Sequence, residues 1–284
     1  MISIRKGNKW LLSALVLLGL FLAGCDEIAQ VAQEAPTPTA IKSTAPTMEE
    51  TDHLEIVPDT GWITLRAGLE SRNLNLYSDE GALLEVIYIA RVDPGLFRFE
   101  VGYQPAGPLA LQGWLDQSGA ALAINGGFFT EKNEATGLVI TNGVSYGQSY
   151  QGFGGMLAVD QDGPALRWLA DEPYSPAEEL TAAVQSFPML VRPGVKIAYS
   201  NSGDDSARRS VIARDSQGNF IFVVAGIGLF TLNELSQFLI DSDLDLDSAL
   251  NLDGGASSGM LLSGSNGGIP SFSLLPTVIL VFEK

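Results

Sequence analysis

The chain of 284 residues contains one cysteine and one histidine. A single cysteine excludes a disulfide framework, and the two residues together are too few for a Cys/His zinc site. A Ser-His-Asp triad would have to use the only histidine, His53, which lies in a polar segment and is assigned no function. These absences exclude most of the familiar forms of nucleophilic and zinc-dependent catalysis.

Basic residues are also scarce: 16 Lys and Arg stand against 33 Asp and Glu, for a formal net charge of −17 at pH 7. Nucleic-acid backbones select basic protein faces, so no nucleic-acid partner is expected. The shares of hydrophobic residues (46%) and charged residues (17%) exclude a disordered chain or a coiled coil. No repeat with a period of 20–50 residues is visible, which disfavours a propeller or a solenoid.

The N-terminus has the pattern of an export signal. Arg5, Lys6 and Lys9 precede an apolar stretch over residues 10–22. At about 13 residues, this stretch is shorter than a membrane span of about 20 and fits a secretory signal peptide. It ends in Leu22-Ala23-Gly24-Cys25, which resembles the lipobox of bacterial lipoproteins, where the cysteine is lipidated. A plain signal peptide with an incidental cysteine is the alternative.

The expected organisation has three parts. Residues 1–24 are a lipoprotein signal peptide, and residues 25–55 are the lipidated Cys25 followed by a disordered linker rich in Pro and Thr. Residues 56–284 form a single domain. An acidic chain is not attracted to anionic lipids, so the acyl chains on Cys25 would hold the protein at the membrane. The predicted location is the extracytoplasmic face of a bacterial cell membrane.

The domain is predicted to contain many strands and few helices. Strands are predicted over residues 62–66, 73–77, 83–92, 97–103, 121–124, 137–141, 156–159, 210–214, 220–225, 249–252 and 278–282. Helices are predicted over residues 109–116 and 232–241, the second opened by a capping box of Thr231 and Glu234. The fold class is therefore α+β, with a mixed, mostly antiparallel sheet core and a few flanking helices.

The sharpest motif is Asn251-Leu252-Asp253-Gly254-Gly255, where an apolar strand delivers a carboxylate to a glycine turn. Paired glycines allow a tight turn and the close approach of a ligand. Residues 255–259 also match G-x-S-x-G, but a nucleophile elbow needs a histidine after the serine, and none follows. That match is accidental.

An alternation of Asp241, Asp243, Asp245 and Asp247 invites comparison with a calcium loop. An EF-hand counted from Asp241 requires Gly at position six and Glu at position twelve, and leucines stand at both places. A solvated acidic turn is therefore favoured, weak calcium binding stays open, and no other cofactor or metal is expected.

Two further stretches carry candidate residues. Asn125-Gly126-Gly127 ends an apolar strand and precedes two phenylalanines, which on its own favours a glycine turn followed by core residues. Arg209 enters a strand in an acidic protein, so it either pairs with a carboxylate or binds an anion. A guanidinium fork suits phosphate, and the residue alone does not separate the two readings.

These stretches occur in an order that resembles the phosphodiester glycosidase family, which includes the enzyme that uncovers mannose 6-phosphate on lysosomal glycoproteins. The family's N-[GA]-G-[YF]-F, R-T-A-[IV]-G and N-L-D-G-G-G-S stretches resemble residues 125–129, 209–213 and 251–257. The resemblance runs from about residue 60 to the C-terminus. Ala256 replaces the third glycine of the last stretch, and Ser210 and Ala213 replace Thr and Gly.

The resemblance implies hydrolysis of sugar-1-phosphodiesters, such as GlcNAc-1-phosphate linkages in cell-envelope glycans, exopolysaccharides or glycolipids. Such a site needs a carboxylate beside an oxocarbenium-like transition state, and cations or amides around the phosphate. Asp253 is the expected catalytic carboxylate, and Arg209 the expected phosphate ligand. The other expected substrate-binding residues are Asn125, Gly126, Gly127, Asn251, Gly254, Gly255 and Ser257. The alternatives are a non-catalytic phosphoglycan-binding module and an envelope scaffold without a site.

Overall fold

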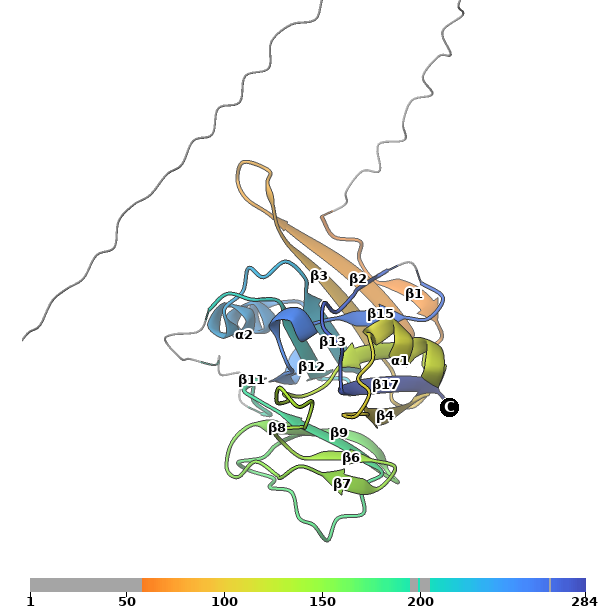
Figure 1. Cartoon of the computed structure of the whole chain (residues 1–284). Coiled ribbons are helices and arrows are strands. Elements are labelled where there is room, and N and C mark those ends of the chain that lie inside the picture. Colours follow the sequence, from red (N-terminus) through yellow and green to blue (C-terminus); the bar gives the residue numbers. More distant parts are fainter. Residues whose placement is uncertain (1–57, 195–198, 200–204, 266) are drawn as a thin grey trace, which may run out of the picture. The chain divides into compact units, whose positions relative to one another are not determined.

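The computed structural model describes residues 58–194, 199, 205–265 and 267–284 (Figure 1). The predicted signal peptide, the lipidation site Cys25, the linker over residues 25–55 and His53 lie outside the described residues. In the part of the chain that is described, no helix is both long enough and apolar enough to cross a membrane.

The described residues form three sheets, in which every strand pair is antiparallel. The first has the order β1 (Ile63–Arg66), β2 (Leu69–Tyr77), β3 (Leu83–Val92), β13 (Phe220–Ala225), β12 (Arg209–Asp215), β14 (Leu246–Asn251) and β11 (Met189–Val191). The second has the order β7 (Val144–Tyr146), β6 (Val139–Thr141), β10 (Ala182–Ser186), β8 (Gly155–Asp160) and β9 (Gly163–Trp168). The third has the order β16 (Gly268–Ile269), β15 (Met260–Leu262), β5 (Leu122–Asn125), β17 (Thr277–Glu283) and β4 (Phe97–Tyr103).

One hydrophobic core joins the three sheets. Phe222 of β13, Leu157 of β8 and Ile279 of β17 are fully buried in the same cluster. Side chains of a strand alternate between its two faces, so the residues next to Phe222 point the other way. Ile221 and Val223 accordingly pack in a second cluster beneath the first sheet's other face. The strands belong to a single domain in which sheets from distant parts of the sequence share a core.

Two helices cover outer faces of these sheets (Figure 1). Helix α2 (Leu232–Asp241) has the predicted bounds, and its capping box is present: the Thr231 side chain accepts from the Glu234 N–H, and the Glu234 carboxylate accepts from the Thr231 N–H. Helix α1 (Leu111–Ser118) begins two residues later than predicted and packs on the third sheet. The predicted α+β class with mostly antiparallel sheets is confirmed.

The strand predictions were least complete for short strands. The predictions over residues 83–92, 97–103 and 220–225 have the observed bounds, whereas the one over residues 73–77 covers only the end of β2. The prediction missed β7, β9, β10, β11, β15 and β16, which have two to six residues each. Runs this short carry little periodic signal. The omission matters because the segment between β10 and β11 lies beside the motif at the end of β14.

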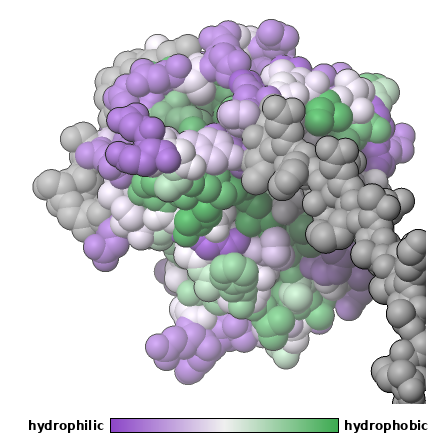
Figure 2. Space-filling model, turned by 90° about the horizontal axis from the view of Figure 1, so that it is seen from above, coloured by the Kyte–Doolittle hydropathy of each residue, from purple (hydrophilic) through white to green (hydrophobic). Residues whose placement is uncertain are grey.

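The surface is not uniformly polar despite the acidic composition. The face drawn in Figure 2 has hydrophobic residues gathered in its middle, with hydrophilic residues around them. Several large apolar side chains are exposed among the described residues, including Phe153, Phe187, Ile227, Leu229, Phe272 and Leu274. Exposed apolar groups that gather in patches commonly mark binding surfaces.

Candidate active site

The order of strands in the first sheet brings the candidate residues together. Strand β14 ends at Asn251 and lies between β12 and β11. Because both neighbours run antiparallel to β14, their first residues lie beside its end: Val211 pairs with Asn251, and Met189 pairs with Leu250. The segments that enter β12 and β11 therefore flank Asp253 on opposite sides.

Asn125, at the end of β5, holds the Asp253 loop from the third sheet. Its Nδ2 donates to the Asp253 carbonyl at 2.8 Å, and its Oδ1 accepts from the Gly259 N–H at 3.1 Å. The Asp253 N–H donates to the Gly126 carbonyl at 3.0 Å. Asn125 is only 1% exposed. This geometry is that of a positioning residue, because its side chain fixes main-chain atoms of the loop.

The Asp253 carboxyl group is partly buried. Its Oδ1 accepts from the Gly254 N–H at 2.9 Å. Burial raises the pKa of Asp253 above its ordinary value, and hydrogen bonds from the Ser257 side chain and the Gly254 N–H oppose that rise. Burial disfavours the charged form of a carboxyl group. Asp253 is thus a partly desolvated carboxylate, which is a common property of catalytic acids and bases.

Arg209 lies beside the residue that follows Asp253. A Cβ atom built on Gly254 would be 3.6 Å from the Arg209 Nη1. The guanidinium also donates from Nε to the Phe230 carbonyl at 3.2 Å and from Nη2 to the Asp205 carbonyl at 2.5 Å. These two contacts are with main-chain oxygens, and they orient the guanidinium. The structure therefore brings Asn125, Arg209 and Asp253 into one place.

The neighbouring Arg208 is a site residue that sequence reasoning missed. Its side chain is buried, its Nη2 donates to the Pro270 carbonyl at 2.7 Å, and its Cζ lies 3.9 Å from the centre of the Phe272 ring. Its Nε and Nη1 have no hydrogen-bond partner within the described residues. Burial lowers the pKa of Arg208, and the charge of Glu85 opposes this, but an arginine stays protonated. Two buried donors are therefore open to an anion or to water.

Glu85 is a second residue that was missed. It is fully buried in β3, and its carboxylate accepts from the N–H groups of Ile227, Gly228 and Leu229 at 2.6, 2.9 and 2.8 Å. The loop that it anchors lies against the main chain at the start of the arginine pair, because a Cβ built on Gly228 would be 3.3 Å from the Arg208 main-chain nitrogen. Glu85 is the only charged residue in the run over residues 83–90, and that interruption is the signal that sequence reasoning had available.

The glycines of the motifs are mostly engaged with the chain itself. The N–H of Gly126 donates to the Thr277 carbonyl at 3.0 Å, and the N–H of Gly255 donates to the Arg208 carbonyl at 2.8 Å. A phosphate contact from these groups, or from Gly254, would require each N–H to leave its present acceptor. At Gly127 the need for glycine is steric, because a Cβ there would lie 2.3 Å from the Gln185 carbonyl oxygen.

Three other residues of the stretch over residues 251–257 have distinct environments. Asn251 is buried, and its Nδ2 donates to the Phe187 carbonyl at 2.8 Å, while its Oδ1 has no partner in the described parts of the chain. Ser257 is buried and shares a hydrogen bond with Ser273. Ala256 is exposed and is not among the residues with positive φ. The replacement of glycine at Ala256 therefore causes no backbone strain.

The acidic run after α2 does not form a metal cluster. Asp243 pairs with Arg72 at 2.9 Å, and Asp245 accepts a hydrogen bond from the Ser216 hydroxyl. Asp247 lies within β14. Over residues 58–194, 199, 205–265 and 267–284, no group of three or more His, Cys, Asp or Glu side chains is arranged to hold a metal ion.

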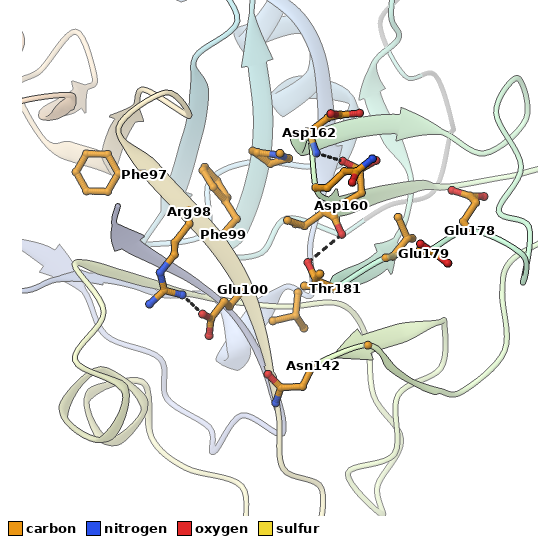
Figure 3. Close-up of a pocket in the computed structure, with 18 of the residues that line it drawn as sticks. Phe97, Arg98, Phe99, Glu100, Asn142, Asp160, Asp162, Glu178, Glu179 and Thr181 are labelled. Carbon is orange, nitrogen blue, oxygen red and sulfur yellow. Dashed lines mark hydrogen bonds and ion pairs between the residues drawn. The ribbon is translucent and has the colours of Figure 1, made fainter.

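A cavity of about 860 Å³ lies elsewhere in the described part of the chain (Figure 3). It lies between β4 and the second sheet, and its lining includes Arg98, Glu100, Asp160, Glu179 and Thr181. Asp160 and Thr181 stand at the ends of β8 and β10 that are opposite to Phe187. The cavity therefore does not coincide with the Asp253 site, and we assign the candidate chemistry on side-chain geometry rather than on cavity size.

Comparison with known proteins identifies both the class and the family of the chain. The model of the phosphodiester glycosidase family, which is a family of glycosidases, matches residues 118–282. The chain belongs to the phosphodiester glycosidase family, and the resemblance seen in the sequence is confirmed. No curated protein matches the chain at a significant level.

Two solved structures share the fold. The zebrafish N-acetylglucosamine-1-phosphodiester alpha-N-acetylglucosaminidase catalytic domain, auto-inhibited by its pro-peptide, has a TM-score of 0.61 and 17% identity, covering 78% of this chain and 86% of that one. A hypothetical protein from Synechocystis has a TM-score of 0.54 and 16% identity, covering 78% of this chain and 63% of that one. At these identities the likeness shows the fold alone.

Proposed function

We propose that this protein hydrolyses sugar-1-phosphodiesters at the bond between C1 and the phosphate oxygen, with Asp253 as the catalytic carboxylate. The products would be a free sugar and a phosphate monoester. The observation that carries the proposal is the partly buried Asp253 carboxylate in a member of the phosphodiester glycosidase family, followed in the chain by Gly254, which lies beside Arg209.

The chemistry suits a site without histidine. A phosphate monoester is a good leaving group, so the reaction depends less on proton donation than the cleavage of an ordinary glycoside. Positive charge builds up on the sugar as the bond to the phosphate breaks. A nearby carboxylate stabilises this oxocarbenium-like transition state or forms a bond to C1. A partly buried carboxylate is less screened by water. The carboxylate therefore stabilises the positive charge on the sugar more strongly.

The phosphate needs positive charge in a protein whose net charge is −17. Arg209 supplies it next to Gly254, and Arg208 adds two buried donors without a partner among the described residues. Guanidinium groups bind phosphate through paired, charge-assisted hydrogen bonds. We assign both arginines to the phosphate, with Asn125 and Asn251 as positioning residues for the loop that bears Asp253.

The proposed setting is the extracytoplasmic face of a bacterial membrane, with the protein anchored by lipid at Cys25. The basic residues, the apolar stretch and the small residues before Cys25 support this location. The substrates would then be phosphodiester-linked sugars of cell-envelope glycans, exopolysaccharides or glycolipids. Mass spectrometry of the mature N-terminus tests the anchor, since an unmodified N-terminus beyond residue 25 would contradict it.

The direct test of the activity uses the purified full chain with UDP-GlcNAc and with a synthetic benzyl phosphodiester of GlcNAc. Free GlcNAc is measured over time, with Asp253→Asn as the matched control. We expect release by the parent and little or none by the variant. Equal release by both would remove Asp253 from the mechanism, and the absence of release across a panel of sugar phosphodiesters would contradict the hydrolase.

A non-catalytic phosphoglycan-binding module is the second candidate. The open donors of Arg208 favour it, because they suit the retention of an anion whether or not the bond is cleaved. The same assay separates the two functions when binding of GlcNAc 1-phosphate is measured in parallel. Binding by the parent without turnover of any phosphodiester would favour the module.

A further inference from the structure

Four aromatic rings form a cluster beside the candidate active site, which we call the ring cluster. Its members are Phe128, Tyr150, Phe153 and Phe187. The ring centres of Phe128 and Phe187 are 4.6 Å apart, those of Tyr150 and Phe153 are 4.9 Å apart, and those of Phe153 and Phe187 are 5.9 Å apart. Phe153 is 49% exposed and Phe187 is 38% exposed. The cluster therefore presents ring surface to solvent instead of completing the core.

Hydrogen bonds hold the ring cluster in place. The Tyr150 N–H donates to the Gln185 Oε1 at 2.8 Å, and the Tyr150 hydroxyl shares a hydrogen bond of 2.8 Å with the Thr136 hydroxyl. The Phe187 carbonyl accepts from the Asn251 Nδ2 at 2.8 Å. This last bond fixes Phe187 to the strand that ends two residues before Asp253.

The ring cluster and the arginines lie on opposite flanks of Asp253. In the order β12-β14-β11, Arg209 begins β12 on one side of β14, and Phe187 precedes β11 on the other. Two strand spacings of about 4.8 Å separate the two flanks by roughly 10 Å. Phe128 approaches from β5, two residues after Gly126, whose carbonyl accepts the Asp253 N–H. A positive flank and an aromatic flank thus border the same carboxylate.

We infer that the exposed faces of Phe153 and Phe187 bind the apolar C–H face of the substrate's sugar ring, while its phosphate binds on the arginine side. This inference rests on the proposed function and adds the orientation of the substrate across Asp253. A hexose phosphate has one strongly anionic end and one uncharged ring with apolar faces. Uncharged aromatic walls suit the ring, and guanidinium groups suit the phosphate.

The orientation places C1 above Asp253. C1 is the atom that joins the sugar to the phosphate, so it lies between the two groups that the flanks bind. A substrate bound in the reverse direction would place its anionic phosphate against the phenylalanine rings. None of the four residues of the ring cluster carries a positive charge that could stabilise it. The arrangement therefore selects sugars with an unobstructed apolar face and a phosphate at C1.

The test compares two probes that share an anion but differ in the sugar: GlcNAc 1-phosphate and inorganic phosphate. Dissociation constants are measured by calorimetry for the full chain, for Phe153→Ala and for Phe153→Leu, which keeps apolar bulk but removes the flat ring. We expect the affinity for GlcNAc 1-phosphate to fall about 3- to 10-fold in both variants. The affinity for inorganic phosphate should stay unchanged.

Tyr146→Ala is the matched control, because Tyr146 is an exposed ring (42% exposed) that pairs with Tyr103 and lies outside the cluster. It should leave both affinities unchanged. The inference is overturned if Phe153→Leu binds GlcNAc 1-phosphate as the parent does, if both probes weaken equally, or if Tyr146→Ala has the same effect. The dissociation constants do not depend on turnover. A negative result in the hydrolase assay therefore remains distinguishable from a substrate orientation that is wrong.

Discussion

The end of β14 and the cavity between β4 and the second sheet both gather charged side chains, but in different ways. At the end of β14, the polar groups are buried and bonded to main-chain atoms, as at Asn125 and Glu85. In the cavity, Arg98 and Glu100 pair with each other while about half of each side chain stays exposed (Figure 3). The first region fixes its groups through main-chain hydrogen bonds, whereas Arg98 and Glu100 in the second stay about half exposed to water.

This difference shows why cavity size alone does not identify a site. Chemistry requires charged groups that are oriented before the substrate arrives and partly shielded from water. The cavity offers about 860 Å³, but the charged side chains of Arg98 and Glu100 in its lining are about half exposed. The Asp253 site offers less enclosed space but a desolvated carboxylate and two oriented arginines. Variants in the two regions should therefore have very different effects.

The largest contrast is expected between Asp253→Asn and Glu179→Gln. Both changes remove one negative charge with almost no change of shape, but Glu179 lines the cavity. Asp253→Asn should lower single-turnover release of sugar by about 10³-fold or more, by analogy with the removal of other catalytic groups. Glu179→Gln should release sugar at the parent rate. A comparable loss in both variants would show that the cavity, not the end of β14, carries the reaction.

The second contrast concerns the arginines. Arg209→Ala and Arg208→Met should each weaken phosphate binding by roughly 10- to 100-fold, because each removes charge-assisted hydrogen bonds worth about 1.5–3 kcal/mol. Methionine keeps the apolar bulk at the buried position 208. Arg98→Ala, in the cavity, should leave the dissociation constant of phosphate unchanged. Unchanged binding in Arg208→Met would mean that its open donors are met by water.

The third contrast is in stability. Asn125→Ala should lower the free energy of unfolding by about 1–3 kcal/mol, because the buried Asp253 carbonyl and Gly259 N–H would lose their partner. Gln161→Ala removes an exposed amide from the cavity lining and should change the free energy of unfolding by less than about 0.5 kcal/mol. Urea denaturation of both variants measures the difference. Equal stabilities would contradict the role of Asn125 as a positioning residue.

The smallest expected effect is the pH dependence of Asp253. Because burial raises its pKa, the fold favours the protonated form, so its contribution to stability is complete below the ordinary value of about 3.9 and is lost as pH rises through the raised pKa. Relative to the parent, Asp253→Asn should therefore gain stability between acidic and neutral pH. Urea denaturation over pH 3–7 measures this gain.

The same shift predicts that turnover by the parent falls on the acid side at a higher pH than an ordinary aspartate would give. A midpoint of the acid limb at or below the ordinary value would contradict the raised pKa. Glu179→Gln, in the cavity, should reproduce the parent profile.

Much of the fold was readable from the sequence because its signals are local. The run over residues 83–92 and the capping box at Thr231 and Glu234 report backbone geometry within a few residues, and both were observed as predicted. The short strands β10 and β11 gave no such signal. Their places are set by pairing with β8 and β14, far away along the chain.

The candidate site shows the same division. Asn125, Arg209 and Asp253 were found because each lies at the end of an apolar run or inside a motif. Arg208 was missed because it has the same sequence context as Arg209 and differs only in burial and in its open donors. Phe187 was missed because its exposure depends on strands that the sequence did not predict.

By itself, the sequence determined the α+β class, the family and the residues that end the motif strands, since composition, periodicity and motif spacing are properties of the chain. Only the tertiary structure decided that β14 lies between β12 and β11, with arginines on one flank of Asp253 and exposed rings on the other. That arrangement depends on antiparallel pairing between segments more than 30 residues apart and on burial in a core shared by three sheets. Long-range pairing and desolvation leave no local trace in a sequence, and here they set which charged groups act and which remain solvated.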